Sequence, residues 1–233
     1  MSEYLEKIVA NLKNIESEEA ESLTLAKEAV AEVIKNDGLI FVFGCGHSHL
    51  PGLDAFYRAG GLANVSPMLD TDLMLHNGAA KSSRMEKMSG IAKEIFRRYV
   101  PTKNDMLFVF SASGKNRLPI EMAIAAKEAG IKTVGISSSS YFERGGELHK
   151  YVDIHIDCKI PYGDACISVG DAKMGGLSTS AACFILNTAL IEGAKAALDD
   201  GVTPPVYLSG NIDGGREHNV VLENLYLGRV KHL

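Results

Sequence analysis

Residues 106–121 read MLFVFSASGKNRLPIE, and they combine the signals of a buried strand, a tight turn and a helix start. Met106 to Phe110 are five consecutive apolar residues, the pattern of a strand that is buried on both faces. The run stops at the small polar segment SASGKN, residues 111–116. Pro119 suits the first turn of a helix, and Gly130 suits its end. Such a turn between a strand and a helix N-terminus favours an anion, above all a phosphate.

Two other predicted strands also end in small polar residues. Residues 39–43 are followed by GCGHSH, and residues 133–136 are followed by four serines. Parallel strands bring such ends to one edge of a sheet, so a shared binding site is expected there. The turn at 111–116 is not a Walker P-loop, because Val109 stands at its first Gly position and Asn116 replaces Ser or Thr.

The same segments resemble those of a known family. SASGKNR is similar to the S-x-S-G-x-[ST] phosphate loop of SIS (sugar isomerase) domains, which bind phosphosugars. FGCGHSH (43–49) resembles the first loop of that family, G-x-G-x-S, with Ser48 at the Ser position. GLSTSAA (176–182) is similar to the segment that opens the last helix. The resemblance covers about residues 36–200 and is nearest to phosphoheptose-isomerase-like members.

This resemblance implies a fold and an assembly. The expected fold is α/β, a three-layer, doubly wound, flavodoxin-like sheet of five parallel strands. Apolar residues at helical spacing predict one long N-terminal helix over residues 1–35, before an SIS domain with a C-terminal tail over residues 36–233. In the family such a helix packs on a partner subunit, so a homodimer or a dimer of dimers is expected.

Three later elements follow from hydrophobic patterning. Apolar residues between 85 and 99 predict one amphipathic helix. Residues 151–158 alternate apolar and polar, as in a half-exposed edge strand whose polar face is solvated. Residues 179–198 are apolar almost all round, which predicts a buried helix.

Composition limits the partners and the compartment. The chain has 233 residues, of which 46% are hydrophobic, and a net charge of −5. That charge argues against nucleic acid or an anionic membrane as a general partner. The N-terminus has no apolar signal core, no apolar stretch approaches a membrane span, and the four cysteines follow no zinc spacing. A cytoplasmic protein with free thiols is expected.

Aldose–ketose isomerisation of a sugar phosphate needs a base that moves a proton between C1 and C2. Our candidates are His218 in the tail and Glu86 at the start of the predicted amphipathic helix, with His47 as a ring-opening group. Arg58 lies near the place where family isomerases often carry a catalytic Glu, so that residue does not carry over. His47 and His49 could hold a metal, but no third ligand is evident, so no metal site is predicted.

The predicted substrate-binding residues lie at the strand ends and at the start of the last helix. They are Gly46, Ser48, His49, Ser111, Ser113, Gly114, Asn116, Ser137, Ser138 and Thr179. The expected ligand is a sugar phosphate, and the expected reaction is aldose–ketose isomerisation through an enediol, of the phosphoheptose-isomerase type, without a cofactor.

Three alternatives remain open. The first is a phosphosugar sensor or binding module with no catalytic base, and the second is a lyase or etherase acting on an amino-sugar phosphate. The third is a dinucleotide-binding enzyme, because Gly44-x-Gly46 follows one strand and Asp70 ends the next. It ranks last, since His49 occupies the third Gly position, where close packing of helix on strand requires a small residue.

Overall fold

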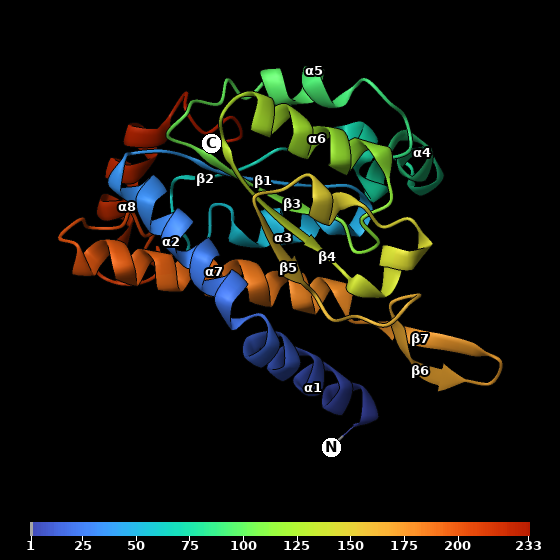
Figure 1. Cartoon of the computed structure of the whole chain (residues 1–233). Coiled ribbons are helices and arrows are strands. Elements are labelled where there is room, and N and C mark those ends of the chain that lie inside the picture. Colours follow the sequence, from blue (N-terminus) through green and yellow to red (C-terminus); the bar gives the residue numbers. More distant parts are fainter. Residues whose placement is uncertain (1) are drawn as a thin grey trace.

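A five-stranded parallel sheet forms the centre of the computed structural model, which describes residues 2–233 (Figure 1). The strand order is β2-β1-β3-β4-β5. These strands are β1 (Ile40–Gly44), β2 (Val65–Pro67), β3 (Met106–Phe110), β4 (Lys132–Ser137) and β5 (Ile154–Asp157). The predicted doubly wound α/β fold is therefore confirmed, and its first and third strands are neighbours, with Ile40 opposite Met106.

Within residues 2–233, eight α-helices surround this sheet or extend from it. They are α1 (Glu3–Glu18), α2 (Ala20–Lys35), α3 (Leu50–Ala55), α4 (Ala79–Met85), α5 (Ala92–Arg97), α6 (Arg117–Glu128), α7 (Ser178–Asp199) and α8 (Gly215–Tyr226). Strand β1 shows why two layers form: Ile40 and Val42 face the α2 and α7 side, whereas Phe41 and Phe43 face the α5 and α6 side. Because both faces are covered, the central strands β1 and β3 contain no polar side chain.

The predicted N-terminal helix is two helices, α1 and α2, which meet at Glu19. Helix α2 packs closely on α7, where a Cβ added at Gly193 would lie only 2.5 Å from Cγ1 of Val30. Helix α1 extends away from the body of the domain (Figure 1). On it, Tyr4 and Leu5 are 40% and 45% exposed.

Two further predictions differ from the structure, and one element was not predicted. The amphipathic helix expected between residues 85 and 99 is divided into α4 and α5, because residues 86–91 leave the helix and Gly90 has a φ of +89°. Strand β5 is the expected edge strand, yet its Asp157 is buried rather than solvated. A hairpin of β6 (Ala165–Val169) and β7 (Ala172–Gly176) was not predicted, and it projects from the domain beside α1 (Figure 1).

Helix α7 contradicts one expectation from the sequence, namely that no apolar stretch approaches the length of a membrane span. It is long and apolar enough, by length and composition, to cross a membrane, so the expectation that no stretch approaches that length is wrong. Several of its residues, among them Ile185 and Leu186, are buried in the core shared with α2. Helix α7 therefore packs on α2 as part of the core of the domain.

Candidate functional site

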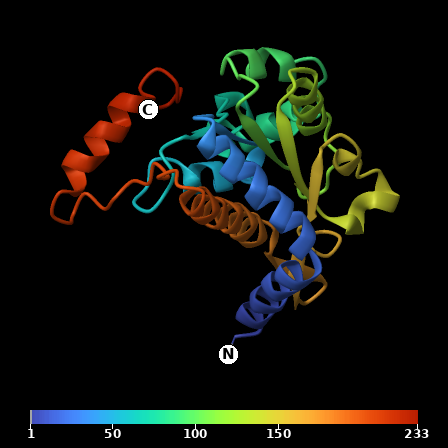
Figure 2. The same ribbon diagram turned by 60° about the vertical axis from the view of Figure 1, so that its left-hand side comes forward.

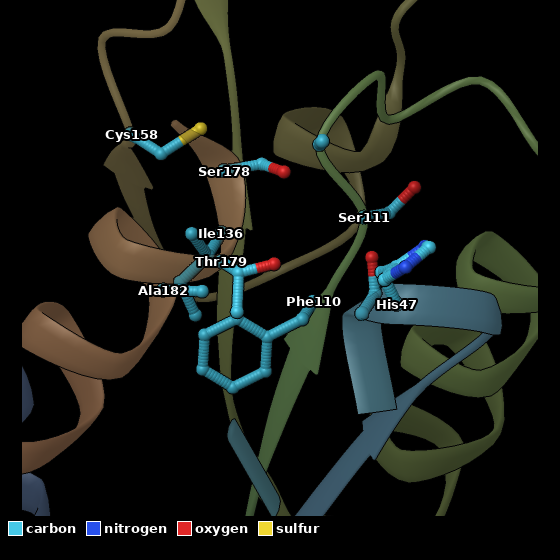
Figure 3. A pocket seen from close by; sticks show the side chains of 10 residues that line it. His47, Phe110, Ser111, Ile136, Cys158, Ser178, Thr179 and Ala182 are labelled. Carbon is cyan, nitrogen blue, oxygen red and sulfur yellow. The ribbon is translucent and has the colours of Figure 1, made fainter. Parts of the chain in front are cut away.

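A small hollow lies at the carboxyl ends of the strands (Figure 3). The hollow is formed by the loops that follow β1, β3 and β5, together with the end of β4 and the start of α7. Its lining residues are His47, Ser48, Phe110, Ser111, Ala112, Ile136, Cys158, Ser178, Thr179 and Ala182. This is the switch point of a doubly wound sheet, where such folds bind their ligands.

The turn after β3 is held by backbone hydrogen bonds. Gly114 has a φ of +60°, and its N–H donates to the carbonyl of Ser111 over 2.8 Å. The Gly114 carbonyl in turn accepts from the N–H groups of Glu147 and Leu148. The segment at 147–148 therefore holds the turn by hydrogen bonds within the domain.

Several donors in this region are left without partners. Within residues 2–233, the N–H groups of Ala112, Ser113 and Asn116 have no acceptor, although the N–H of Lys115 reaches Oγ of Ser113 over 3.3 Å. The free N–H groups thus differ partly from those we expected, Gly114 to Asn116.

The hydroxyl groups in the hollow divide into free and occupied ones. Those of Ser48, Ser111 and Thr179 line the hollow and have no hydrogen-bond partner within residues 2–233. In contrast, Ser178 donates to Oδ2 of Asp164 over 2.7 Å. The free groups lie where a phosphate or a sugar hydroxyl would be bound.

The first loop is a short 3-10 turn, Gly46–His49, in which Gly46 has a φ of +56°. A Cβ at Gly44 would lie 2.0 Å from the carbonyl oxygen of Ser48, so only glycine fits there. His47 is exposed and lines the hollow. His49 is buried and its Nδ1 contacts the carbonyl of Gly46, and burial lowers its pKa.

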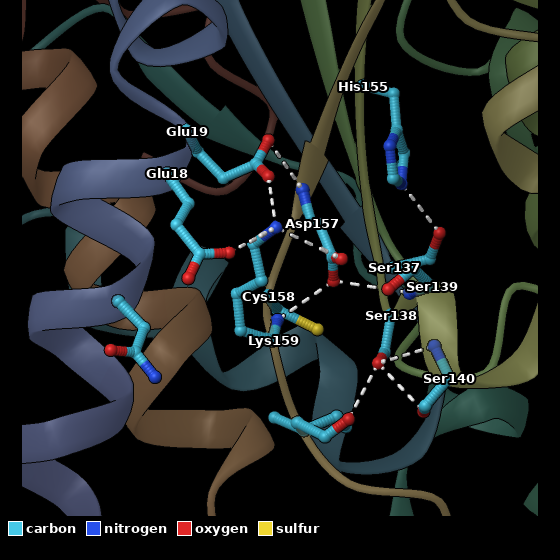
Figure 4. A network of polar contacts seen from close by, with 12 residues as sticks. Glu18, Glu19, Ser137, Ser138, Ser139, Ser140, His155, Asp157, Cys158 and Lys159 are labelled. Atoms are coloured by element: carbon cyan, nitrogen blue, oxygen red, sulfur yellow. Dashed lines mark hydrogen bonds and ion pairs between the residues drawn. The ribbon is translucent and has the colours of Figure 1, made fainter.

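Ser137 and Ser138 are buried and bonded within the domain, and neither lines the hollow. The Ser137 hydroxyl lies 2.9 Å from Nε2 of His155, and the Ser138 hydroxyl donates to the carbonyl of Ile160 over 2.7 Å (Figure 4). Burial lowers the pKa of His155. These two serines support the loop after β4, and their hydroxyls are not free for a ligand.

Glu86 lies close to the turn after β3. Its carbonyl accepts from the N–H of Leu118 in α6, and its half-buried carboxyl faces Asn116. Burial raises the pKa of Glu86, although the contact with Asn116 opposes the rise. The chain therefore places a carboxyl group of raised pKa beside the turn, but outside the residues that line the hollow.

His218 is not near these residues in the single chain. It lies on α8, where Nε2 donates to the carbonyl of Val206 over 2.9 Å. Val206 bridges to Leu62, which precedes β2, and Arg229 after α8 binds Asp37, which precedes β1. Helix α8 therefore lies toward the amino ends of the strands and stands off from the body in Figure 2. Our expectation that His218 reaches the strand-end cleft does not hold within one chain.

Six lining residues are not among those predicted from the sequence, and two of them, Cys158 and Ser178, carry a thiol or a hydroxyl group. Cys158 directly follows β5, so the rule that strand ends form the site would have found it. Burial raises its pKa to about 12, which keeps it a thiol at neutral pH. Ser178 stands next to Thr179 in the segment that carried the family resemblance.

The wall of the hollow at Cys158 is tied to the N-terminal helices. The side chain of Asn11 in α1 donates to the carbonyls of Cys158 and Lys159, over 3.2 and 3.0 Å. The Lys159 ammonium pairs with Glu19 over 2.7 Å and with Asp157 over 3.5 Å (Figure 4). The junction of α1 and α2 thus holds the backbone that forms one side of the site.

A metal centre is not assembled in the described part of the chain. Residues 2–233 contain no group of three His, Cys, Asp or Glu side chains close enough to hold an ion. His47 and His49 also point apart, since one lines the hollow and the other is turned to the carbonyl of Gly46.

Comparison with known proteins gives the family. The sequence profile described as "SIS domain" matches residues 3–138. A UPF0309 protein of Caldanaerobacter subterraneus subsp. tengcongensis is 39% identical, over 99% of this chain and 98% of that protein.

Two solved structures share the fold. A phosphoheptose isomerase from Francisella tularensis has a TM-score of 0.54 and 14% identity, over 82% of this chain and 95% of that one. The Vibrio vulnificus NanR protein, complexed with ManNAc-6P, has a TM-score of 0.56 and 16% identity, over 95% of this chain and 68% of that one. With the profile match and the close relative, these findings show that the chain belongs to the SIS domain family and, within it, to the UPF0309 proteins.

Proposed function

We propose that this protein binds a sugar phosphate in the hollow and interconverts its aldose and ketose forms. One observation carries the proposal: unpartnered N–H and hydroxyl donors meet at the turn 111–116, beside the N-terminus of α6. A phosphate there would accept from Ala112, Ser113 and Asn116 N–H groups and from the Ser111 hydroxyl, in the field of the helix dipole. The sugar would then extend toward Ser48 and Thr179.

The proton transfers need a group that can act near neutral pH. Glu86 is the strongest candidate in a single chain, because burial raises its pKa toward the range in which a carboxylate is an effective base. It would remove the proton next to the carbonyl and return it to the neighbouring carbon. His47 lines the hollow and would contact a sugar oxygen during ring opening. His218 remains a candidate only in an assembly where a second copy brings it to the hollow.

A binding module without catalysis is the second candidate function. It is favoured by one specific observation: the residues that line the hollow include no carboxylate. Glu86 would then only support Asn116, and the protein would hold a sugar phosphate without changing it.

Exchange of substrate protons with solvent separates the two candidates. Pentose, hexose and heptose phosphates are first screened by thermal shift, with inorganic phosphate as control, since a ligand of the native state raises the melting temperature. Those that bind are then incubated with the protein in D₂O, and the C1 and C2 protons are followed by NMR. An isomerase incorporates deuterium, and Glu86→Gln abolishes the exchange while binding remains.

The control variant is Glu94→Gln, because Glu94 is an exposed carboxylate on α5 that pairs with the exposed Arg97. It should exchange protons as the wild type does. Tight binding with neither exchange nor isomerisation of any sugar phosphate would exclude the isomerase and leave the binding module.

We also propose that the protein is a homodimer or a dimer of dimers. Helix α1 and the β6–β7 hairpin project together, and the hydroxyl of Tyr4 donates to the carbonyl of Gly176 over 2.9 Å. Exposed apolar side chains lie on both elements, including Leu5, Val169 and Met174. A second copy of the chain would cover them.

A further inference from the structure

Asp164 occupies the N-terminus of α7, the second helix start at the hollow. Its Oδ1 accepts from the N–H groups of Leu177 and Ser178 over 2.9 and 2.8 Å, and its Oδ2 accepts from the Ser178 hydroxyl over 2.7 Å. A Cβ at Gly176 would lie 2.8 Å from Oδ2, so glycine makes room for this carboxylate. Asp164 itself has a φ of +67°, a conformation that non-glycine residues rarely adopt.

This carboxylate changes the electrostatics of one end of the hollow. Free first-turn N–H groups and the helix dipole would make the N-terminus of α7 attractive to an anion. Asp164 already uses two of those N–H groups and adds a full negative charge next to Ser178, a lining residue. An anion of a ligand would therefore meet a carboxylate there, beside the hydroxyl of Thr179.

Among the described residues, no Lys or Arg side chain in the lining of the hollow offsets the negative charge of Asp164. Among residues 2–233, those that line the hollow include neither Lys nor Arg, and their one basic side chain is His47. Lys159 follows the lining residue Cys158 but is paired with Glu18, Glu19 and Asp157. The hollow thus has free donors at the turn 111–116 and a carboxylate at the opposite helix.

We propose that Asp164 restricts the ligand to sugar phosphates with a single anionic group, and that it excludes sugar bisphosphates and phosphorylated sugar acids. The inference rests on the proposed function, because it assumes that the phosphate binds at the turn 111–116. An uncharged, hydroxyl-rich chain then extends toward Thr179 and Ser178. A second phosphate or a carboxylate at the far end of that chain meets Asp164.

The Asp164 carboxylate lies directly behind the lining of the hollow, because its Oδ2 accepts from the hydroxyl of the lining residue Ser178. Burial raises the pKa of Cys158, and the charges of Asp157 and Asp164 raise it further. A second ligand charge placed about 6 Å from the Asp164 carboxylate would weaken binding between roughly threefold in a water-like medium and about a hundredfold at an effective dielectric constant of 20. We therefore expect at least about a threefold preference for the singly anionic ligand.

The test compares matched ligands and a charge-only variant. The tightest monophosphate from the thermal-shift panel is measured by calorimetry beside the bisphosphate and the aldonic acid phosphate of the same chain length. Asp164→Asn keeps acceptors for the two N–H groups but removes the charge. Asp171→Asn removes an exposed charge at the hairpin tip and serves as control.

The wild type should bind the monophosphate at least about threefold more tightly than either doubly anionic ligand. Asp164→Asn should reduce this ratio threefold or more, whereas Asp171→Asn should leave it unchanged. Equal affinities in the wild type, or an unchanged ratio in Asp164→Asn, would overturn the inference. If Asp164→Asn does not fold, the wild-type ratio alone decides. If no sugar phosphate binds at all, the proposed function fails and this inference fails with it, whereas binding without discrimination overturns the inference alone.

Discussion

Replacing Gly114 by alanine tests whether the turn after β3 must keep its shape to hold phosphate. The new Cβ would lie 3.2 Å from Cβ of Ser137 and 3.3 Å from Cβ of Leu148, and the residue would have to adopt a φ of +60°. A matched control exists in Gly130→Ala, because Gly130 has a φ of +73° but nothing lies within 4 Å of its Cβ.

The two variants separate backbone strain from steric contact. The left-handed conformation costs an L-residue about 1–2 kcal/mol, partly offset by the lower entropy of an unfolded chain with alanine, so Gly130→Ala should lose about 1 kcal/mol. Gly114→Ala adds overpacking against two buried residues, which typically costs about 1–3 kcal/mol. We therefore expect it to lose about 2–4 kcal/mol.

Urea unfolding followed by circular dichroism measures both losses, and calorimetry with the best sugar phosphate measures binding. Gly114→Ala should bind at least tenfold more weakly than the wild type, since the turn has to move away from Ser137. Gly130→Ala should bind normally. Equal stability of the two variants, or normal binding by Gly114→Ala, would refute the reasoning.

Three further predictions concern the hollow, its wall and the N-terminal helix. Removing the hydroxyls of Ser111 and Ser113 by alanine substitution should weaken sugar-phosphate binding by about 1–3 kcal/mol, the range for hydrogen bonds to a charged group, and unchanged affinity in calorimetry would contradict the assigned phosphate position. Although burial raises the pKa of Asp157, surrounding donors hold it below its usual 3.8, so its ionised form stabilises the fold above that pH. The stability advantage of the wild type over Asp157→Asn should therefore be full at pH 6 and shrink as the pH falls below 3.8. A stability advantage that grows as the pH falls would contradict this prediction. Finally, Tyr4→Ser combined with Leu5→Lys should lower the oligomeric state seen by sedimentation, and a wild type that sediments as a monomer at micromolar concentration would exclude the proposed dimer.

The central sheet could be predicted because local and global signals agree. Strands buried on both faces must be apolar at every position, and the runs that became β1 and β3 are. The hairpin of β6 and β7 gave no such signal, because it is exposed and its second strand reads AKMGG. The break between α4 and α5 was hidden since apolar residues keep helical spacing across Gly90.

The site was predicted more accurately in position than in detail. Strand ends located the hollow, but the sequence cannot reveal which hydroxyl is already bonded: Ser137 contacts His155, while Ser111 stays free. His218 was expected near the cleft from its place after the last core helix. That topological place does not determine to which edge of the sheet a C-terminal helix returns.

The close packing of α2 on α7 has a consequence for synthesis of the chain. Val30 and Gly193 are in tight contact, yet about 160 residues separate them, and ribosomes add about 5–20 residues per second. The apolar face of α2 therefore stays without its partner helix for roughly 8–30 s during translation. Strand β1 is also made before its neighbour β3, so residues 20–44 emerge without either of these partners. Folding of this domain is thus largely completed only after α7 has left the ribosome, and in the meantime α2 is a surface that chaperones can bind.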